Sequence, residues 1–161
     1  MKILGVDPAL TITGYGLISA QKKKISLIEA GIIKTSASYG LACRIERIYT
    51  GIRRLIIQTR PDVIVLEKLY AHYRHPATAF HLGHARGVIV LACAQEKVTL
   101  IEYGATRIKK AVVGRGLATK YQVQRMVAGM TGLKSLPKYT DVTDALALAI
   151  AHSHIVRAKG I

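Results

Sequence analysis

Four acidic residues border apolar runs in a chain that has only 9 Asp and Glu against 24 Lys and Arg. They are Asp7, Glu67, Asp141 and Asp144. The first two end short apolar runs typical of buried strands, and the last two open a longer apolar run typical of a helix. The i, i+3 spacing of Asp141 and Asp144 places both side chains on one face of the first helical turn. We therefore expect these carboxylates to lie at functional positions.

Clustered carboxylates favour metal-dependent chemistry. Their oxygens are the ligands that hard cations such as Mg²⁺ and Mn²⁺ prefer, and two such ions can activate a water and stabilise the leaving oxygen of a phosphodiester. Each acid also has a structural explanation, since Asp141 or Asp144 could cap a helix and Asp7 could anchor a turn. Glu67 has no such local role at the end of four apolar strand residues. Together the four favour a site that binds two Mg²⁺ ions.

The charge of the chain indicates a polyanionic partner. The formal net charge is +15, and no acidic residue occurs between Glu102 and Asp141. That stretch holds eight basic residues: Arg107, Lys109, Lys110, Arg115, Lys120, Arg125, Lys134 and Lys138. A membrane surface is the alternative partner, but an interfacial helix needs large apolar residues opposite its charges. Nucleic acid is therefore favoured.

The hydrophobic pattern predicts an α/β domain. Period-two and continuous apolar runs predict strands, and apolar residues at helical spacing predict helices. The expected strands are residues 2–7, 14–18, 25–33, 63–67 and 98–103, and the expected helices are residues 41–59, 77–95, 105–111, 119–130 and 142–156. This order predicts one domain over residues 1–161, with a mixed sheet flanked by helices.

Location and redox state are inferred from what the sequence contains. The apolar runs are shorter than a membrane span, and we expect no signal peptide or transmembrane helix. Cys43 and Cys93 lie in apolar helical contexts and do not form a zinc-binding pattern. We interpret both as reduced core residues of a cytosolic protein.

Several motifs, in order along nearly the whole chain, match one family. They are residues 1–8 (MKILGVDP), 13–16 (TGYG), Glu67, 83–88 (GHARGV), 103–109, 112–114 (VVG), 120–123 (KYQV) and 141–147 (DVTDALA). These motifs resemble the RuvC family of Holliday-junction resolvases. The resemblance implies a ribonuclease H-like fold with a five-stranded mixed sheet. The activity it implies is a homodimer that makes paired nicks across a four-way DNA junction in recombination and repair, leaving 5′-phosphate and 3′-hydroxyl ends.

The resemblance also assigns roles to individual residues. The metal-binding acids of the family fall on Asp7, Glu67, Asp141 and Asp144. Its DNA-contacting lysines fall on Lys109 and Lys120. The family implies a partnership with the RuvA–RuvB branch-migration complex.

The junction-stacking aromatic of the family falls on Tyr70, where Phe is more usual, and Ala9 stands where the family usually has Gly. Tyr70 and Arg74 belong to a loop that interleaves aromatic and basic residues, which suits contact with splayed DNA. Arg115 lies between Gly114 and Gly116, which could cradle a phosphate or form a plain turn. With the neighbouring Lys110, these residues complete the expected DNA contacts.

Other functions remain open at this stage. A related ribonuclease H-like nuclease could act on structured RNA, and a non-catalytic module could bind junctions without cutting them. An actin-like ATP-binding protein shares an Asp followed by a Thr/Gly turn after its first strand, but it needs a duplicated domain for which this chain is too short. Gly83 and Gly87 permit close backbone approach on one helix, either within the chain or at a dimer interface.

Overall fold

The computed structural model describes residues 1–21, 24–69, 76–158 and 160. Its sheet contains β1 (Lys2–Asp7), β2 (Ile12–Gln21), β3 (Lys24–Lys34), β4 (Val63–Glu67) and β5 (Thr99–Tyr103). The strand order is β3-β2-β1-β4-β5. β1 pairs antiparallel with β2, and β2 with β3, whereas β1 with β4 and β4 with β5 are parallel. The sheet is therefore mixed, and its parallel half begins at β1.

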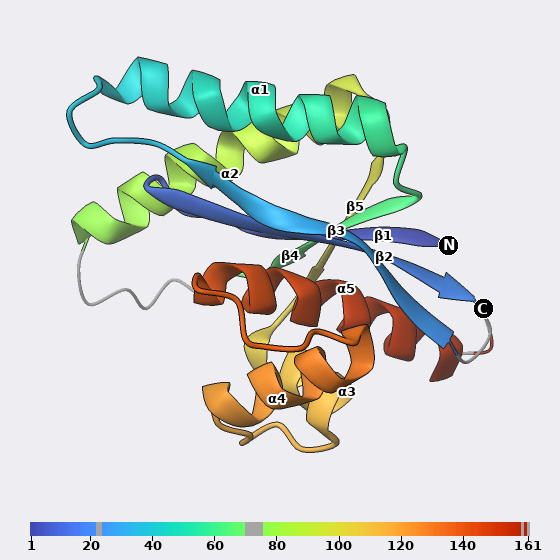
Figure 1. Ribbon diagram of the computed structural model, residues 1–161. Helices are drawn as coiled ribbons and strands as arrows, with labels where there is room; N and C mark the ends of the chain where they lie inside the picture. The colour runs from blue at the N-terminus through green and yellow to red at the C-terminus, as the bar shows by residue number, and fades with distance from the viewer. Residues whose placement is uncertain (22–23, 70–75, 159, 161) are drawn as a thin grey trace.

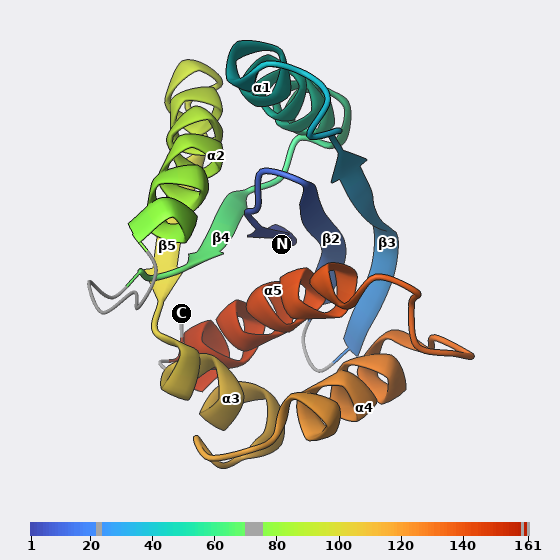
Figure 2. The same cartoon turned by 90° about the vertical axis from the view of Figure 1, so that its left-hand side faces the viewer.

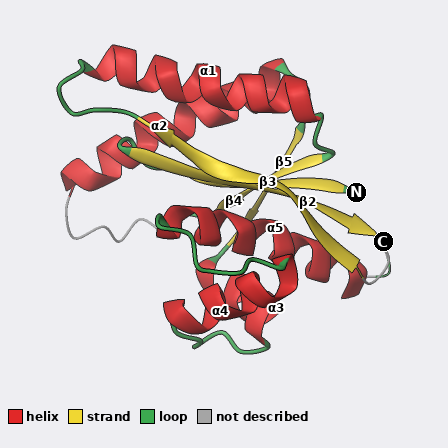
Figure 3. Cartoon of the chain, viewed as in Figure 1, coloured by secondary structure: helices red, strands yellow, loops and turns green. Residues whose placement is uncertain are grey.

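In the part of the chain that the structure describes, five helices cover the two faces of this sheet. They are α1 (Leu41–Thr59), α2 (Pro76–Gln95), α3 (Ala105–Val113), α4 (Lys120–Thr131) and α5 (Thr140–Ala158). Figure 1 shows α1 and α2 on one face and α5 against the other, with α3 and α4 outside α5. Figure 3 gives the same view by type of element. The result is a layered α/β structure in which the central strands are covered on both sides.

The continuous apolar runs of β1 and β4 follow from this double covering. Ile3 and Val63 face the core under α5, whereas Leu4 and Ile64 face the core under α1 and α2. All four side chains are buried. Because strand side chains alternate between faces, a strand covered on both sides needs apolar residues at every position. The runs therefore end where the sheet reaches solvent, and the acids Asp7 and Glu67 take those end positions.

The predicted fold class is confirmed, together with the order of the ten elements among the described residues. Several boundaries differ from those predicted. α5 begins at Thr140 rather than at residue 142, so Asp141 lies inside its first turn. β2 begins two residues earlier than expected, at Ile12, because Thr13 and Gly14 pair with β1 and β3. No helix in the described part of the chain is long and apolar enough to cross a membrane.

One prediction about the core was wrong. Cys93 is buried, but Cys43 is exposed in the first turn of α1. The buried stripe of this helix consists of Ile48, Ile52, Leu55 and Ile56. Cys43 precedes Ile48 by five residues, which places it about 140° around the helix from that residue. An apolar neighbourhood in the sequence did not reveal this rotation.

Candidate active site

Asp7 and Glu67 end two neighbouring parallel strands at the same edge of the sheet. The register of β1 and β4 pairs Leu4 with Ile64 and Gly5 with Val65. Extending this register by two residues places Asp7 beside Glu67. In sheets of this kind the carboxyl ends of parallel strands are where ligands bind. The predicted juxtaposition of these two acids is therefore present.

Glycines on β1 and β2 bring the start of α5 onto the sheet. Gly14 pairs with Asp7 across the two strands. A Cβ atom on Gly14 would lie 2.8 Å from the Cβ of Asp141 and closer still to its backbone carbonyl. A Cβ on Gly5 would likewise meet the backbone of α5 at Ala145. Because neither position has a side chain, the helix backbone packs directly on the strands and delivers Asp141 and Asp144 beside Asp7. The sequence analysis did not assign this role to the glycines.

The turn that follows Asp7 is fixed by a buried threonine. Thr13 Oγ1 donates to the carbonyl of Ala9 at 2.7 Å and accepts from the Ala9 N–H at 3.3 Å. Thr13 is fully buried. This pair of bonds closes the loop between β1 and β2 with Ala9 in place, so the alanine that departs from the usual family glycine is accommodated.

The electrostatics of Asp7 show that all four carboxylates are close together. The pKa of Asp7 is raised from 3.8 to about 7. Burial is the largest cause, followed by the charges of Asp144, Asp141 and Glu67 in that order. Lys120 opposes them. A carboxylate that is desolvated and surrounded by like charges favours either a proton or a bound cation. The structure thus brings together the four acids that the sequence singled out.

Two lysines lie among these acids. Lys120 Nζ contacts Asp144 Oδ2 at 2.6 Å, and this hydrogen bond is the largest cause of the raised pKa of Lys120. Glu67 is exposed as a residue, yet neighbouring protein atoms partly desolvate its carboxylate and thereby raise its pKa. The charge of Asp144 raises this pKa further, and the charge of Lys109 lowers it. Lys109 and Lys120, the two lysines to which the family resemblance assigned DNA contacts, therefore lie at the acidic site.

The donor set fits a hard divalent cation. Within the described residues, no three His, Cys, Asp or Glu side chains are already gathered closely enough to hold one ion. Lys120 instead places its ammonium group on Asp144, where it supplies positive charge to the cluster. The charges of Asp144, Asp141 and Glu67 raise the pKa of Asp7, and a cation held between these carboxylates would relieve that repulsion.

Two cavities meet at Glu67. One, of about 290 Å³, is lined by Glu67, Asp144, Lys109 and Lys120 together with apolar residues of α3, α4 and α5. The other, of about 350 Å³, is lined by Asp7, Glu67, Lys68 and Arg86, among others. Glu67 therefore lines both cavities, and each cavity is also lined by at least one other acidic residue and at least one basic residue.

Arg86 is a site residue that the sequence analysis quoted only as part of a motif. Its Nη1 donates to the backbone carbonyl of Glu67 at 2.9 Å, and its guanidinium forms an ion pair with Glu102. Arg86 thus ties α2 to the end of β4 and to β5. We interpret Arg86 as a residue that positions Glu67.

Two other residues predicted to contact DNA, Lys110 and Arg115, do not line the cavities at the carboxylates. Lys110 is exposed in the last turn of α3, and Arg115 is exposed on the following loop. Tyr70 and Arg74 lie outside the described residues. Their predicted contacts with the junction stay predictions.

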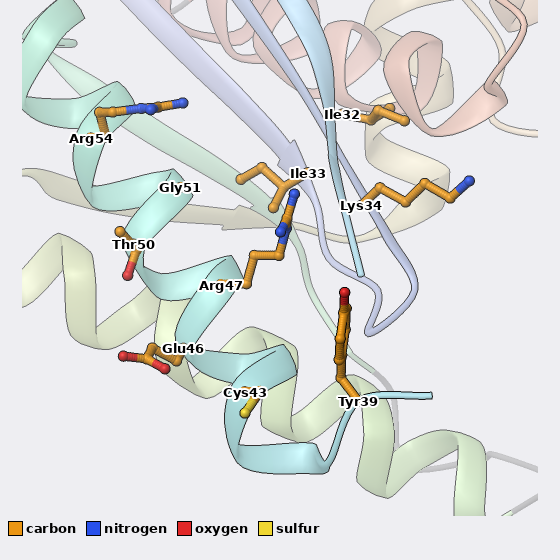
Figure 4. Close-up of a pocket in the computed structure, with 10 residues that line it drawn as sticks. All are labelled: Ile32, Ile33, Lys34, Tyr39, Cys43, Glu46, Arg47, Thr50, Gly51 and Arg54. Carbon is orange, nitrogen blue, oxygen red and sulfur yellow. The ribbon is translucent and has the colours of Figure 1, made fainter. Parts of the chain in front are cut away.

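A separate groove of about 600 Å³ lies between α1 and β3, away from the four carboxylates. Figure 4 shows Arg47 and Tyr39 directed toward β3, with Arg47 ending beside Ile33, while Glu46 points away from the strand. Arg54 lines the same groove about one helical turn further along α1 than Thr50 does. The groove has basic and apolar lining but no pair of acids, so it lacks the groups for metal-dependent catalysis.

Divalent metal is expected to stabilise the protein most at alkaline pH. The pKa of Asp7 is about 7 in the folded state against 3.8 ordinarily, so the folded state binds this proton more tightly than the unfolded state. The contribution of Asp7 to stability is therefore greatest below about pH 4 and is lost as the pH rises to about 7. Mg²⁺ at about 100 times its Kd should restore about 2.7 kcal/mol. Thermal melts with and without Mg²⁺ at pH 5 and pH 8 measure this. An equal shift at both pH values would contradict the expectation, and Asp7→Asn is the control.

The fold and site together define a class of protein. A five-stranded mixed sheet in the order β3-β2-β1-β4-β5, with acids at the ends of β1 and β4 and at the start of α5, is a ribonuclease H-like fold with a nuclease-type carboxylate site. Figure 2 shows α1 and α2 above the sheet and α5 below it.

Comparison with known proteins places the chain within that class. Residues 3–152 match the family model for the crossover junction endodeoxyribonuclease RuvC. The RuvC of Legionella pneumophila (strain Lens) is 43% identical over 153 residues, covering 95% of this chain and 87% of that protein. The RuvC of Caldicellulosiruptor saccharolyticus is 39% identical, covering 94% and 92% respectively. The structure of T. thermophilus RuvC in complex with Holliday junction substrate matches with a TM-score of 0.93 at 31% identity, covering 99% of this chain and 96% of that chain.

The chain belongs to the RuvC family of crossover junction endodeoxyribonucleases. Nucleases of this family depend on a metal, which agrees with the carboxylate donor set.

Proposed function

We propose that the chain resolves four-way DNA junctions in recombination and repair, with two Mg²⁺ ions held by the four acids. The observation that carries this proposal is the convergence of Asp7, Glu67, Asp141 and Asp144 at one sheet edge. The surrounding chain has a formal net charge of +15. A negative pocket in a positive protein attracts both the metal and the phosphate backbone that the metal must reach.

The residues of the site divide the work of phosphodiester hydrolysis. Asp7 and Glu67 would hold cations from the strand ends, and Asp141 and Asp144 from the first turn of α5. When bound, such cations activate a water and stabilise the departing oxygen. Lys109 and Lys120 line the adjoining cavity and would hold the phosphate against the acids. Cleavage then leaves a 5′-phosphate and a 3′-hydroxyl.

Lys120 connects metal binding to substrate binding. Its ammonium group lies 2.6 Å from Asp144 Oδ2. If Asp144 held a cation, Lys120 would be free to pair with a phosphate oxygen of the DNA. The ordered exchange would keep the acidic cluster partly neutralised at each stage, which limits its mutual repulsion.

We infer that the active form is a homodimer that assembles through α2. Phe80, Val90 and Leu91 are exposed apolar residues on this helix. Gly83 and Gly87 lie at helical spacing between them, and a Cβ built on either meets nothing within 4 Å in the part of the chain that the structure describes. Intrachain packing therefore does not account for these glycines, and a second copy can approach the helix closely. Two-fold symmetry would match the near two-fold symmetry of a junction and present one site to each cut strand.

Leu91→Glu is expected to weaken the dimer. The leucine side chain is 49% exposed in the monomer. In a two-fold symmetric dimer, the substitution would bury two charges, one from each protomer, so the dimer Kd should rise at least about tenfold. Sedimentation equilibrium measures this. Ile28→Glu is the matched control, because Ile28 is 47% exposed on β3. Equal dimer dissociation constants for the two variants would contradict the proposal that the dimer forms through α2.

The activity is tested with a synthetic four-way junction, Mg²⁺ and the wild-type protein. Symmetrical nicks on two opposed strands are expected, with ends that ligase seals. A structured RNA of equal length is the comparison, since a ribonuclease H-like nuclease for RNA would cut it in preference. Binding of the junction without metal-dependent nicking would indicate a non-catalytic module.

The cellular setting follows from the substrate. Four-way junctions form on chromosomal DNA, so we place the activity in the cytoplasm. The RuvA–RuvB branch-migration complex is the partner that the family implies, and the chain is proposed to form a single resolvase domain over residues 1–161.

A further inference from the structure

The loop between α3 and α4 presents a leucine to solvent. Leu117 is 95% exposed, more than any other large apolar residue identified as exposed in the described part of the chain. Its neighbours on either side are not exposed to this degree, since Ala118 is buried and Gly116 is partly buried. A single exposed leucine on a loose loop would need no explanation. The anchoring of this loop sets Leu117 apart.

Both ends of the loop are fixed by hydrogen bonds. Gly114 caps α3 in the left-handed conformation, with φ of 89°, and its N–H donates to the carbonyl of Lys110 at 2.9 Å. Thr119 caps α4, where its hydroxyl accepts from the N–H of Gln122 at 3.2 Å. The Gln122 side chain in turn accepts from the N–H of Thr119 at 2.9 Å. This reciprocal arrangement fixes the start of α4.

The middle of the loop is fixed by packing. A Cβ on Gly116 would lie 2.6 Å from the Thr106 methyl group, so the loop backbone rests on α3. The side chain of Ala118 is only 2% exposed and belongs to the core under α5. Leu117 is therefore held outward between two anchored residues. Because little conformational entropy is left to lose, a ligand that buries this side chain gains most of the hydrophobic free energy.

Cations surround the exposed leucine. Arg115 and Lys120 lie two residues before and three residues after it, and both are exposed. Tyr121, 60% exposed, follows at the start of α4. Residues 103 to 140 contain no acid, so every charged residue close to Leu117 in the sequence is basic. Such a basic segment attracts DNA phosphates, but an apolar side chain gains nothing from a phosphate, so its contact must be with sugars or bases.

The position of Leu117 relative to the carboxylates limits which nucleotides it can reach. Three residues separate it from Lys120, whose ammonium group is 2.6 Å from Asp144. The backbone between Leu117 and Lys120 spans at most about 10 Å, which corresponds to about three base-pair steps of a DNA strand at 3.4 Å each. The Lys120 side chain adds its own length, so Leu117 lies a few nucleotides from the phosphate that the acids would cleave. Figure 2 shows this loop below α5.

We propose that Leu117 is a DNA-contacting wedge that packs against deoxyribose and base edges in the minor groove, within a few nucleotides of the cleaved phosphate. The proposal rests on the proposed junction-cleaving function and adds a residue that selects for deformable DNA. Apolar side chains inserted at the minor groove unstack base steps, and steps beside a junction are already weakened in stacking. The basic side chains around the leucine would bind the DNA phosphates, and the leucine would bind more tightly at base steps that unstack easily.

The test compares four variants on a four-way junction in EDTA, which prevents cleavage. Leu117→Ser is expected to weaken binding about tenfold at every salt concentration, leaving the slope of log K against log salt unchanged. Arg115→Gln is expected to lower that slope by about 1. Leu117→Met retains an apolar side chain and should bind as wild type. Ile57→Ser, at a residue 50% exposed on α1, is the matched control and should have no effect.

A second readout reports base stacking directly. With 2-aminopurine placed within a few nucleotides of the cleaved phosphate, wild type and Leu117→Met should raise its fluorescence on binding, and Leu117→Ser should not. If Leu117→Ser bound the junction with wild-type affinity and raised the fluorescence as wild type does, the wedge proposal would be wrong. Junction cleavage by the wild-type protein in Mg²⁺ would still support the proposed function. Loss of affinity that follows weakened self-association would make Leu117 a protein contact and also overturn the wedge. A wild-type protein that neither binds nor cleaves the junction would overturn both proposals.

Discussion

Asp7→Asn is expected to lower the single-turnover rate of junction cleavage by about a thousandfold or more, which corresponds to about 4 kcal/mol of lost transition-state stabilisation. Asp7 is the most strongly perturbed of the four acids, and the other three all act on its pKa. An amide keeps the shape of the side chain but loses the charge that a cation needs. Junction binding should be kept or slightly tightened, because a negative charge is removed from the face that receives DNA.

The stability of this variant separates lost catalysis from misfolding. At pH 8 and without divalent metal, the folded wild type must hold a buried carboxylate whose pKa is raised to about 7. The asparagine removes this charge, so Asp7→Asn should melt at a higher temperature than wild type under these conditions. Asp62→Asn is the matched control, since Asp62 only accepts from the N–H of Lys2 at 2.6 Å at the opposite end of β1. Nicking that survives in Asp7→Asn would remove the acids from the mechanism.

The acids could be found from the sequence because the fold constrains their neighbours. A strand buried on both faces leaves no polar residue in its interior, so the first acid after the run marks the sheet edge. Asp7 and Glu67 were both found by this rule. Their adjacency followed from a helical crossover between two strands, which makes the strands parallel. Family resemblance then assigned the same residues, so two independent arguments agreed.

The residues that position the acids could not be found in the same way. Gly5 and Gly14 matter because the backbone of α5 packs against them, and that contact joins segments more than 120 residues apart in the sequence. Arg86 binds the carbonyl of Glu67, a group that every residue has. Neither interaction leaves a pattern in residue type. Spacing reveals what a residue is next to along an element, whereas these roles depend on the docking of one element against another.

The exposure of single side chains was also beyond the sequence. Cys43 and Leu117 are both apolar residues in apolar or mixed neighbourhoods, and both are exposed. Cys43 is turned away from the buried stripe of α1 by its helical position. Leu117 is turned outward because the residues on either side are anchored. In both cases the backbone conformation of a few residues decides the exposure.

The glycine contacts make α5 the element whose placement decides activity. Its first turn carries two of the four acids, and its backbone touches β1 and β2 with no side chain between them. A displacement of this helix would move Asp141 and Asp144 together, while Asp7 and Glu67 stayed on the strands. The site can therefore be separated into two halves by a change that touches none of its acids.

Gly14→Ala is expected to do this. The new methyl carbon would lie 2.8 Å from the Cβ of Asp141 and closer to its carbonyl, so α5 must move outward. A misplacement of about 1 Å can cost about a hundredfold in rate, and overpacking should lower the stability by about 1–3 kcal/mol. Single-turnover cleavage and thermal melting measure the two effects.

Gly40→Ala supplies the control for this substitution. Gly40 precedes α1 with φ of −58°, and a Cβ there meets nothing within 4 Å among the described residues. It adds the same methyl group without a collision, so both rate and stability should stay close to wild type. Higher Mg²⁺ should recover part of the activity of Gly14→Ala, because a weakened but intact set of ligands binds metal at higher concentration. A Gly14→Ala protein with wild-type rate and melting temperature would show that α5 does not rest on this strand, and the link between the glycine contacts and the acidic site would be lost.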